Sequence, residues 1–162
     1  MTRYSRIEIR KQALNFSAAH FTIFNKTDRE NLHGHNFQVE CELTAPVGDD
    51  GLMFDYGIIK QALRELCDEL DEQMILPAHS PHLTIEEDGD YSVAIFNGER
   101  LPFLSRDLTV LPIANSTVEE ISHYLLGLLV DHSSFAERGI IEMTVKVSSS
   151  PGQTGCSTWK QT

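Results

Sequence analysis

The segment from Leu32 to Thr44 reads LHGHNFQVECELT, and its pattern indicates the architecture of the chain. From Asn36 onward, polar residues alternate with the apolar residues Phe37, Val39, Cys41 and Leu43. A period of two is typical of a β-strand that buries one face in a core. The stretch from Ile7 to Leu14 alternates in roughly the same way and predicts another strand. Between the two, Thr22 to Leu32 is polar and has the length of an irregular functional loop.

A first helix is predicted after the Pro- and Gly-containing turn at residues 45–51. The helical segment opens at Asp55, and apolar residues recur every three or four positions from Ile58 to Leu70. This spacing is that of an amphipathic helix, which we expect to end before Pro77.

A second helix and two strands are predicted in the last third of the chain. The helix is expected to begin at Asn115 to Thr117, where Ser116 or Thr117 can cap it and Glu119 or Glu120 completes a capping box. The two strands are Ile140 to Val147 and Cys156 to Lys160.

Residues from about 81 to 112 are predicted to contain a hairpin. Val93 to Phe96 and Leu101 to Leu104 flank the turn dipeptide Asn97-Gly98. The acidic cluster formed by Glu86 to Asp88 and by Asp90 is interpreted as a solvated surface loop. The order of elements predicts a single α+β domain over residues 1–162, with mainly antiparallel pairing.

Composition narrows the classes of function. The 162 residues include 24 Asp and Glu against 13 Lys and Arg, which gives a net charge of −11. An acidic surface repels phosphate backbones and anionic lipid, so neither nucleic acid nor a membrane surface is an expected partner. No apolar stretch approaches the roughly 20 residues of a membrane span. Three widely spaced cysteines argue against a disulfide framework and favour a cytoplasmic location.

Three histidines carry the strongest chemical signal. His33 and His35 lie two residues apart in extended chain, so they project from one face, and His20 can approach from the end of the neighbouring strand. Three histidines without a nearby cysteine indicate an open zinc site rather than a closed structural one. The pair followed by Glu40 also imitates a cupin motif, but Glu40 lies on the opposite face of the strand.

Four motifs make the chain resemble the 6-pyruvoyl-tetrahydropterin synthase family, which includes 6-carboxytetrahydropterin synthase. They are FSAAH at 16–20, LHGHNF at 32–37, GLMFDY at 51–56 followed by a helix and Leu70-Asp71, and the closing Gly155-Cys156 strand. The resemblance does not cover residues 81–112, which it implies to be an insertion. The resemblance implies a tunnelling fold, with a four-stranded antiparallel sheet and two helices on one face. It also implies assembly as a homo-oligomer, either a trimer or a hexamer of two stacked trimers, with pockets between subunits.

The resemblance further implies a metal and a substrate. It implies Zn²⁺ held by His20, His33 and His35, and the small-molecule pterin 7,8-dihydroneopterin triphosphate as substrate. The reaction would belong to pterin metabolism, with queuosine biosynthesis among the pathways implied.

The catalytic positions depart from the family pattern. Family enzymes place a cysteine base shortly before His-Gly-His, but here that loop offers a carboxylate, and Glu30 is the candidate base. An Asp-His pair after the first helix is replaced by Asp71 and Glu72, of which one could serve as an acid. His79 or His82 could fold back to replace the missing histidine.

The substrate-binding positions are also altered. The family anchors its pterin through a glutamate, but the matching stretch here is Val147-Ser-Ser-Ser. Ser149 and Ser150 can hydrogen-bond a pterin edge but cannot pair with it ionically. The resemblance places further pterin contacts near Ser116 and Thr117.

Two functions are therefore open. The first is a zinc-dependent lyase of the 6-carboxytetrahydropterin synthase type, or a variant that gives another 6-substituted pterin such as 6-hydroxymethyl-dihydropterin. The second is a non-catalytic relative that keeps zinc and acts as a binding or assembly protein.

Overall fold

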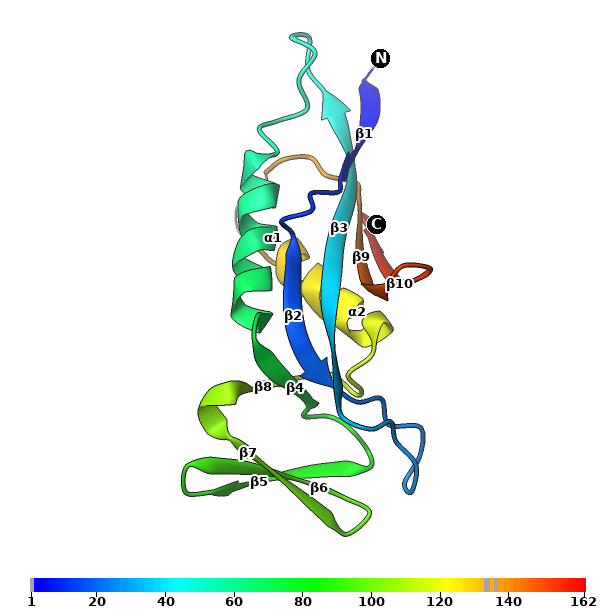
Figure 1. The fold of residues 1–162 in the computed structure, drawn as a ribbon. Helices are drawn as coiled ribbons and strands as arrows, with labels where there is room; N and C mark the ends of the chain where they lie inside the picture. The colour runs from blue at the N-terminus through cyan, green and yellow to red at the C-terminus, as the bar shows by residue number, and fades with distance from the viewer. Residues whose placement is uncertain (1, 133–134, 136) are drawn as a thin grey trace.

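Strand β3 (His33–Val47) is the longest strand of the structure, a computed structural model that describes residues 2–132, 135 and 137–162 (Figure 1). The first part of β3 pairs antiparallel with β2 (Asn15–His20), and its second part pairs antiparallel with β1 (Arg3–Ile9). On its other edge β3 pairs with β9 (Glu142–Ser150), which pairs in turn with β10 (Gln153–Lys160). These pairings form the main sheet.

Two short strands extend the main sheet beyond β2, so the expectation of four strands is wrong. Strand β4 (Gln73–Pro77) pairs parallel with β2, and β8 (Leu108–Leu111) pairs parallel with β4. The described residues thus form a seven-stranded sheet. A run as short as β4, directly after a helix, shows no period of its own, and its partner β8 lies far along the chain.

The strand predicted from Ile7 to Leu14 is also corrected. Strand β1 ends at Ile9, and the amide of Leu14 donates to the carbonyl of Lys11 (2.9 Å) in a turn that leads into β2. Apolar residues on the two sides of this turn imitated one continuous alternation. The other predicted strands overlap β3, β9 and β10.

Both predicted helices are confirmed, and they cover one face of the main sheet (Figure 1). Helix α1 (Gly57–Leu70) packs on β2, and α2 (Val118–Val130) packs on β9 and β10. Their apolar stripes enter the main hydrophobic core. The fully buried helix residues of this core include Ile59, Leu63, Ile121 and Leu129.

The N-terminus of α2 is held in place by a cap and by a close contact. The hydroxyl of Thr117 accepts the amide of Glu120 (3.4 Å), as the capping pattern predicted. The carboxylate of Glu120 accepts the amide of Ala114 (2.7 Å) and so closes the turn before the helix. A Cβ at Gly155 would lie 2.4 Å from the carbonyl carbon of Val118, so only glycine lets β10 approach this closely.

The predicted hairpin is confirmed, and a third strand extends it to a three-stranded antiparallel sheet, which we call the meander. It consists of β5 (Leu83–Asp88), β6 (Tyr91–Phe96) and β7 (Glu99–Leu104), and a short 3-10 helix (Ser105–Asp107) leads from it to β8. The predicted turn is confirmed, because Asn97 and Gly98 both have positive φ (48° and 79°). The predicted acidic loop is corrected, because Glu86 to Asp88 are exposed residues of a strand.

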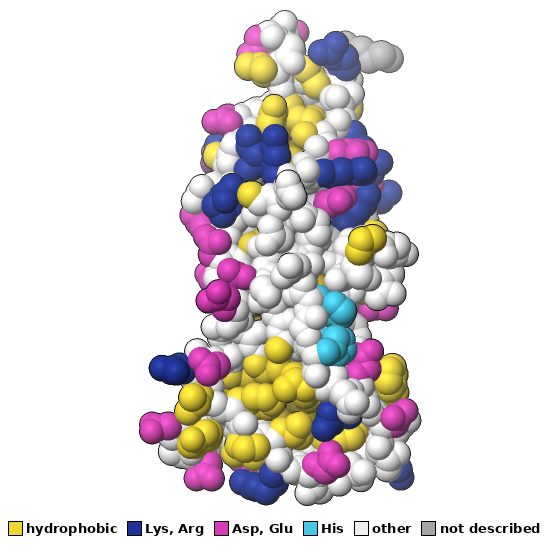
Figure 2. All heavy atoms as spheres, in the orientation of Figure 1, with side chains coloured by type: hydrophobic (Ala, Val, Ile, Leu, Met, Phe, Trp, Pro, Cys, Tyr) yellow, Lys and Arg dark blue, Asp and Glu magenta, His cyan; other side chains and the backbone are white. Residues whose placement is uncertain are grey.

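A second hydrophobic core joins the meander to the rest of the molecule. Its buried residues come from the loop after β2, from β4 and from the meander: Phe21, Ile23, Met74, Leu76, Leu83, Ala94 and Phe96. Figure 2 shows hydrophobic side chains gathered at this end of the molecule. The meander is therefore packed against the same loop that precedes the histidine pair.

The class of the fold follows from these elements. The described residues form an α+β structure with two helices on one face of a curved sheet. Neither helix has the length and apolar character needed to cross a membrane.

A buried carboxylate lies on the sheet face that the helices do not cover. Glu42 is only 6% exposed, and its side chain accepts a hydrogen bond from Lys146. The guanidinium groups of Arg6 and Arg10 lie 3.4 and 3.3 Å from its two oxygens. The hydrogen bond from Lys146 lowers the pKa of Glu42, against the opposing effect of burial.

We predict that Glu42→Gln lowers the free energy of unfolding by about 1–3 kcal/mol near neutral pH. The folded-state pKa of Glu42 is depressed, so its contribution is present above the unfolded pKa of about 4.3 and is lost as the pH falls through the folded value. Denaturant unfolding from about pH 7 to about pH 3 should therefore give stability curves that converge in acid.

Glu40→Gln provides the matched control for this comparison. Glu40 pairs with Arg10 at 3.3 Å, but its side chain is 28% exposed against 7% for Glu42. We expect a smaller loss, of about 0–1 kcal/mol. A difference between Glu42→Gln and wild type that stays constant with pH would contradict the assigned ion pair.

Candidate metal centre and active site

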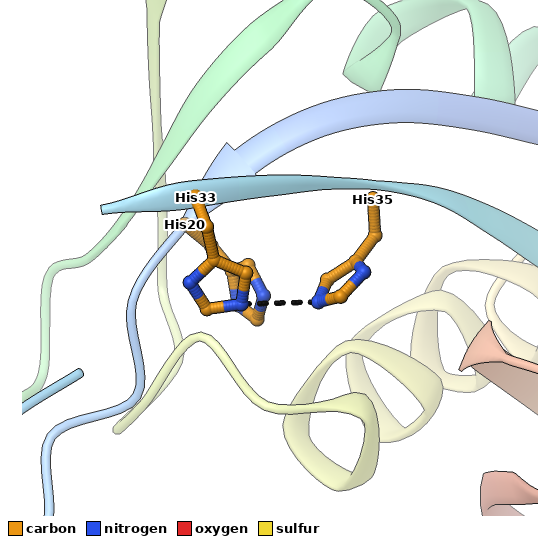
Figure 3. A group of neighbouring side chains, drawn as sticks. All are labelled: His20, His33 and His35. Atoms are coloured by element: carbon orange, nitrogen blue, oxygen red, sulfur yellow. Dashed lines mark hydrogen bonds between the residues drawn. The ribbon is translucent and has the colours of Figure 1, made fainter. Parts of the chain in front are cut away.

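The three predicted ligands meet where β2 ends and β3 begins (Figure 3). His20 and His33 are partners in the antiparallel register of these strands, and His35 lies two residues further along β3. One ring nitrogen from each histidine lies within 4.8 Å of the others. The Nε2 atoms of His33 and His35 are 3.0 Å apart. Tetrahedral ligands at about 2.05 Å from zinc lie about 3.3 Å from one another, so the spacing is close to that of a metal site.

Hydrogen bonds orient two of the imidazoles. The Nδ1 of His20 lies 2.6 Å from the carbonyl oxygen of Ser116, and the Nδ1 of His33 lies 2.8 Å from that of Asn31. A carbonyl can only accept, so each Nδ1 carries the proton, and the Nε2 lone pair can accept a hydrogen bond or bind a metal. Backbone carbonyls that fix the tautomer in this way are typical of metal-binding histidines.

A buried nitrogen atom without a hydrogen-bond partner supports metal binding at this place. The Nε2 of His20 is fully buried and has no hydrogen-bond partner. Such an orphaned polar atom costs free energy unless something else binds it. Burial lowers the pKa of His20, with its hydrogen bond to Ser116 opposing and the charges of His33 and His35 adding to the shift. The neutral imidazole that results is the form that binds a metal.

The donor set fits zinc in an open site. It consists of three imidazoles, and no cysteine belongs to the group that the described residues form. Three protein ligands leave the fourth tetrahedral position for water or substrate. Gly34 between the ligands lets β2 and β3 lie close together, since a Cβ there would lie 3.3 Å from the carbonyl oxygen of Ala18.

Glu30 lies in the same cavity as the three histidines. Its carboxylate accepts the amide of Thr22 (2.9 Å), and its own amide donates to the carbonyl of Thr22 (2.9 Å). Burial raises the pKa of Glu30, but the hydrogen bonds from Thr22 and the nearby His33 outweigh this and leave the pKa lowered. The carboxylate is therefore ionised near neutral pH and faces the ligand cluster.

The cavity has a volume of about 320 Å³ and is open to solvent. Its lining residues are His20, Thr22, Glu30, His33, His35, Thr117, Val118, Glu119, Ser149, Gln153 and Thr154. None of these is Lys or Arg. Strands β2 and β3 supply the histidines, and the polar loop supplies Glu30. The start of α2, the end of β9 and the start of β10 form the opposite wall of the cavity.

The four predicted substrate-binding residues have different positions. Thr117 and Ser149 line the cavity. Ser116 is fully buried, and its hydroxyl donates to the carbonyl of Ile75 (3.3 Å), so only its carbonyl faces the site. Ser150 is exposed at the end of β9 and does not line the cavity.

Asp71 and Glu72 lie outside this cavity. Asp71 follows α1, and its carboxylate accepts the amide of Ser17 in β2 (2.7 Å). Glu72 is exposed and has a positive φ of 58°. The five residues of β4 lie between Asp71 and His79, a distance of about 16 Å in extended chain, so His79 and His82 do not fold back onto this pair.

Sequence reasoning missed several residues of the cavity. Gln153 and Thr154 are the first residues of β10, where its register with β9 shifts, and no local pattern marks them as part of a site. The sequence predicts that Glu119 or Glu120 completes the capping box; in the structure Glu120 closes the turn, and Glu119 lines the cavity. A capping box with two adjacent acidic residues leaves one of them free, which is the signal that could have identified Glu119.

The fold and the site define a class of protein: an α+β domain with a candidate three-histidine metal centre and a carboxylate in the same cavity. Residues 8–157 match the family model described as 6-pyruvoyl tetrahydropterin synthase. The chain belongs to this family.

Individual relatives agree with this assignment. The chain is 28% identical over 155 residues to a candidate 6-carboxy-5,6,7,8-tetrahydropterin synthase of Methanocaldococcus jannaschii, covering 88% of each chain. The crystal structure of 6-pyruvoyl tetrahydropterin synthase from Plasmodium vivax is 32% identical, with a TM-score of 0.92, and covers 98% of this chain and 99% of its own. The Plasmodium falciparum enzyme is also 32% identical, with a TM-score of 0.91 and the same coverage.

We predict that the protein binds about one Zn²⁺ per chain and that His20→Ala removes this binding, because three imidazoles leave no spare ligand. Elemental analysis after dialysis, and titration of Zn²⁺ into chelator-treated protein, measure the effect. His123→Ala on the exposed face of α2 is the control and should retain the metal. A wild-type protein that takes up no Zn²⁺ would contradict the site.

Proposed function

We propose that the protein is a zinc-dependent lyase of pterin metabolism that acts on 7,8-dihydroneopterin triphosphate. The observation that carries the proposal is the shared cavity of Glu30 and the three histidines. A metal and a general base that face one small space are the two groups needed to acidify a hydroxyl and remove a proton. The product would be 6-carboxytetrahydropterin or another 6-substituted pterin.

A carboxylate base has support from the relatives. Two further Plasmodium vivax 6-pyruvoyltetrahydropterin synthase structures, each 32% identical to this chain, carry alanine or cysteine in place of a catalytic glutamate. In that protein a glutamate therefore serves in catalysis. We assign the same role to Glu30, because its carboxylate lines the cavity and the loop that holds it contains no cysteine.

The residues of the cavity fall into two groups, one that transfers a proton and one that binds the substrate. Zinc, when bound, supplies Lewis acidity that lowers the pKa of a hydroxyl near it. The ionised Glu30 carboxylate accepts the proton from the substrate side chain, and the Thr22 amide keeps one oxygen of this carboxylate oriented. The hydroxyls of Thr117 and Ser149 and the carboxylate of Glu119 offer hydrogen bonds to the pterin edge.

The charge of the cavity indicates which end of the substrate it holds. No Lys or Arg is among its lining residues, whereas a triphosphate is bound best by cations. We therefore place the pterin ring and its hydroxylated side chain inside and the triphosphate toward solvent.

Asp71 and Glu72 can act only if another subunit presents them. Within one chain they lie outside the cavity, and both are exposed. A homo-oligomer in which one subunit's Asp71 and Glu72 approach the neighbour's cavity would restore the second acid-base group that the family pattern places here.

We predict that Glu30→Gln lowers kcat by about 10²- to 10⁴-fold with KM nearly unchanged, because it removes a base and not a binding group. Turnover of dihydroneopterin triphosphate, with the product identified by mass spectrometry, measures the effect. Zinc content should equal that of wild type. Asp28→Asn, an exposed charge in the same loop, is the control and should keep full activity.

Zinc binding by the wild type without turnover of this substrate would overturn the lyase. It would favour the second function, a zinc-binding relative without catalysis, for which the serines at the position of the pterin-anchoring glutamate are the supporting feature.

A further inference from the structure

The meander contacts the loop that carries Glu30, and the contact is made by Arg29. The Arg29 guanidinium lies over two aromatic rings, 4.8 Å from the centroid of Phe21 and 5.7 Å from that of Phe96. Phe21 precedes the loop, whereas Phe96 is the last residue of β6 in the meander. Arg29 is thus held between the body of the protein and the inserted sheet.

Arg29 also makes two polar contacts through its terminal nitrogens. One terminal nitrogen donates to the carbonyl oxygen of Glu30 (2.8 Å), and the other lies 3.3 Å from the carboxylate of Glu99 in β7. The side chain of Arg29 is 17% exposed and that of Glu99 is 65% exposed. An ion pair with so exposed a partner is weak, so the ring stacking and the bond to the Glu30 carbonyl are the main contacts.

The opposite side of the same loop is also clamped. Ile23 and Arg29 form an antiparallel bridge, so the loop is a small hairpin. The side-chain amide of Asn115 accepts the amide of Ile23 (3.0 Å) and donates to its carbonyl (2.8 Å). Asn115 therefore holds one side of the hairpin and Arg29 the other.

These contacts fix the backbone of Glu30 at both of its polar groups. Its amide is bonded to Thr22, and its carbonyl is bonded to Arg29. A carboxylate can transfer a proton efficiently only if its backbone holds it at a constant distance from the reacting atom. The predicted catalytic residues include neither Arg29 nor any residue of the meander.

We propose that Arg29 is a positioning residue for Glu30 and that the meander acts as a brace that holds Arg29 in place. The proposal rests on the proposed lyase function for its kinetic consequence, but the bracing itself is a property of the chain. The inserted segment then serves the active site without touching the substrate. The same segment lies within the 98% of this chain that the Plasmodium vivax structure covers.

The variant that tests this is Arg29→Met, which keeps an unbranched apolar stem but removes the guanidinium that stacks on Phe21 and Phe96 and donates to Glu30. Arg100→Met is the matched control, because Arg100 lies in the meander and, like Arg29, pairs with a glutamate (Glu86, 3.3 Å), but it is exposed. We expect Arg29→Met to lower kcat by about 10- to 100-fold with KM and zinc content unchanged. Arg29→Lys should fall between this variant and wild type, because it keeps a donor but loses the planar group. Arg100→Met should match wild type.

A double-mutant cycle separates positioning from general damage. If Arg29 acts through Glu30, Arg29→Met has no further effect on the residual rate of Glu30→Gln, measured in single turnover. The same fractional loss in both backgrounds would overturn the proposal. So would a loss in Arg29→Met that appears in KM alone.

Hydrogen exchange provides a readout that does not depend on activity. In Arg29→Met the amides of Thr22 and Glu30 should exchange faster than in wild type, while the amides of β3 keep their protection. Unchanged exchange at these two amides would overturn the brace. If the wild type does not turn over dihydroneopterin triphosphate, the lyase fails, whereas the exchange measurement still decides the role of Arg29.

Discussion

The hydrogen bond between the Nδ1 of His20 and the carbonyl of Ser116 joins the end of β2 to the start of α2. Its neighbours extend the same connection. The hydroxyl of Ser116 donates to Ile75 in β4, and the side chain of Asn115 pairs with Ile23 in the polar loop. Three consecutive residues, Asn115 to Thr117, thus fix the relative positions of His20, β4, the polar loop and the N-terminus of α2. The tautomer of His20, and with it the candidate metal centre, depends on this arrangement.

The histidine cluster could be predicted from sequence because its geometry is local. A period of two places His33 and His35 on one face, and the antiparallel partner of His33 at the end of β2 is His20. The two helices were predictable for the same reason, since their stripes follow a local period. The strand predicted from Ile7 to Leu14 was misplaced because the chain turns at Lys11 without a glycine or proline to mark the turn.

The remaining features depend on contacts between distant segments. Strands β4 and β8 are too short to show a period that identifies them. They also pair in parallel although the whole meander separates them in the sequence. The contact between Arg29 and Phe96 joins residues that no spacing rule relates. Four residues of the cavity lining that lie far from the histidines in sequence, Val118 and Glu119 in α2 and Gln153 and Thr154 in β10, are likewise brought in by tertiary packing. Sequence reasoning could name the ligands and the candidate base but not the surfaces that hold them.

The brace on the Glu30 loop has a physical rationale in the difference between a carboxylate and a thiolate. A glutamate is ionised near neutral pH without help, and the amide of Thr22 lowers its pKa further, so it needs less electrostatic activation than a cysteine. It has three side-chain torsions where cysteine has one, however, and fixing them costs up to about 1.5–2 kcal/mol of entropy. The hydrogen bond from the Thr22 amide to the Glu30 carboxylate restrains these torsions before substrate binds, and the contacts on the Glu30 backbone keep the two groups in register. A carboxylate base therefore needs less adjustment of its pKa than a thiolate base but a more rigidly held loop. The contacts of Arg29 with the meander supply this rigidity.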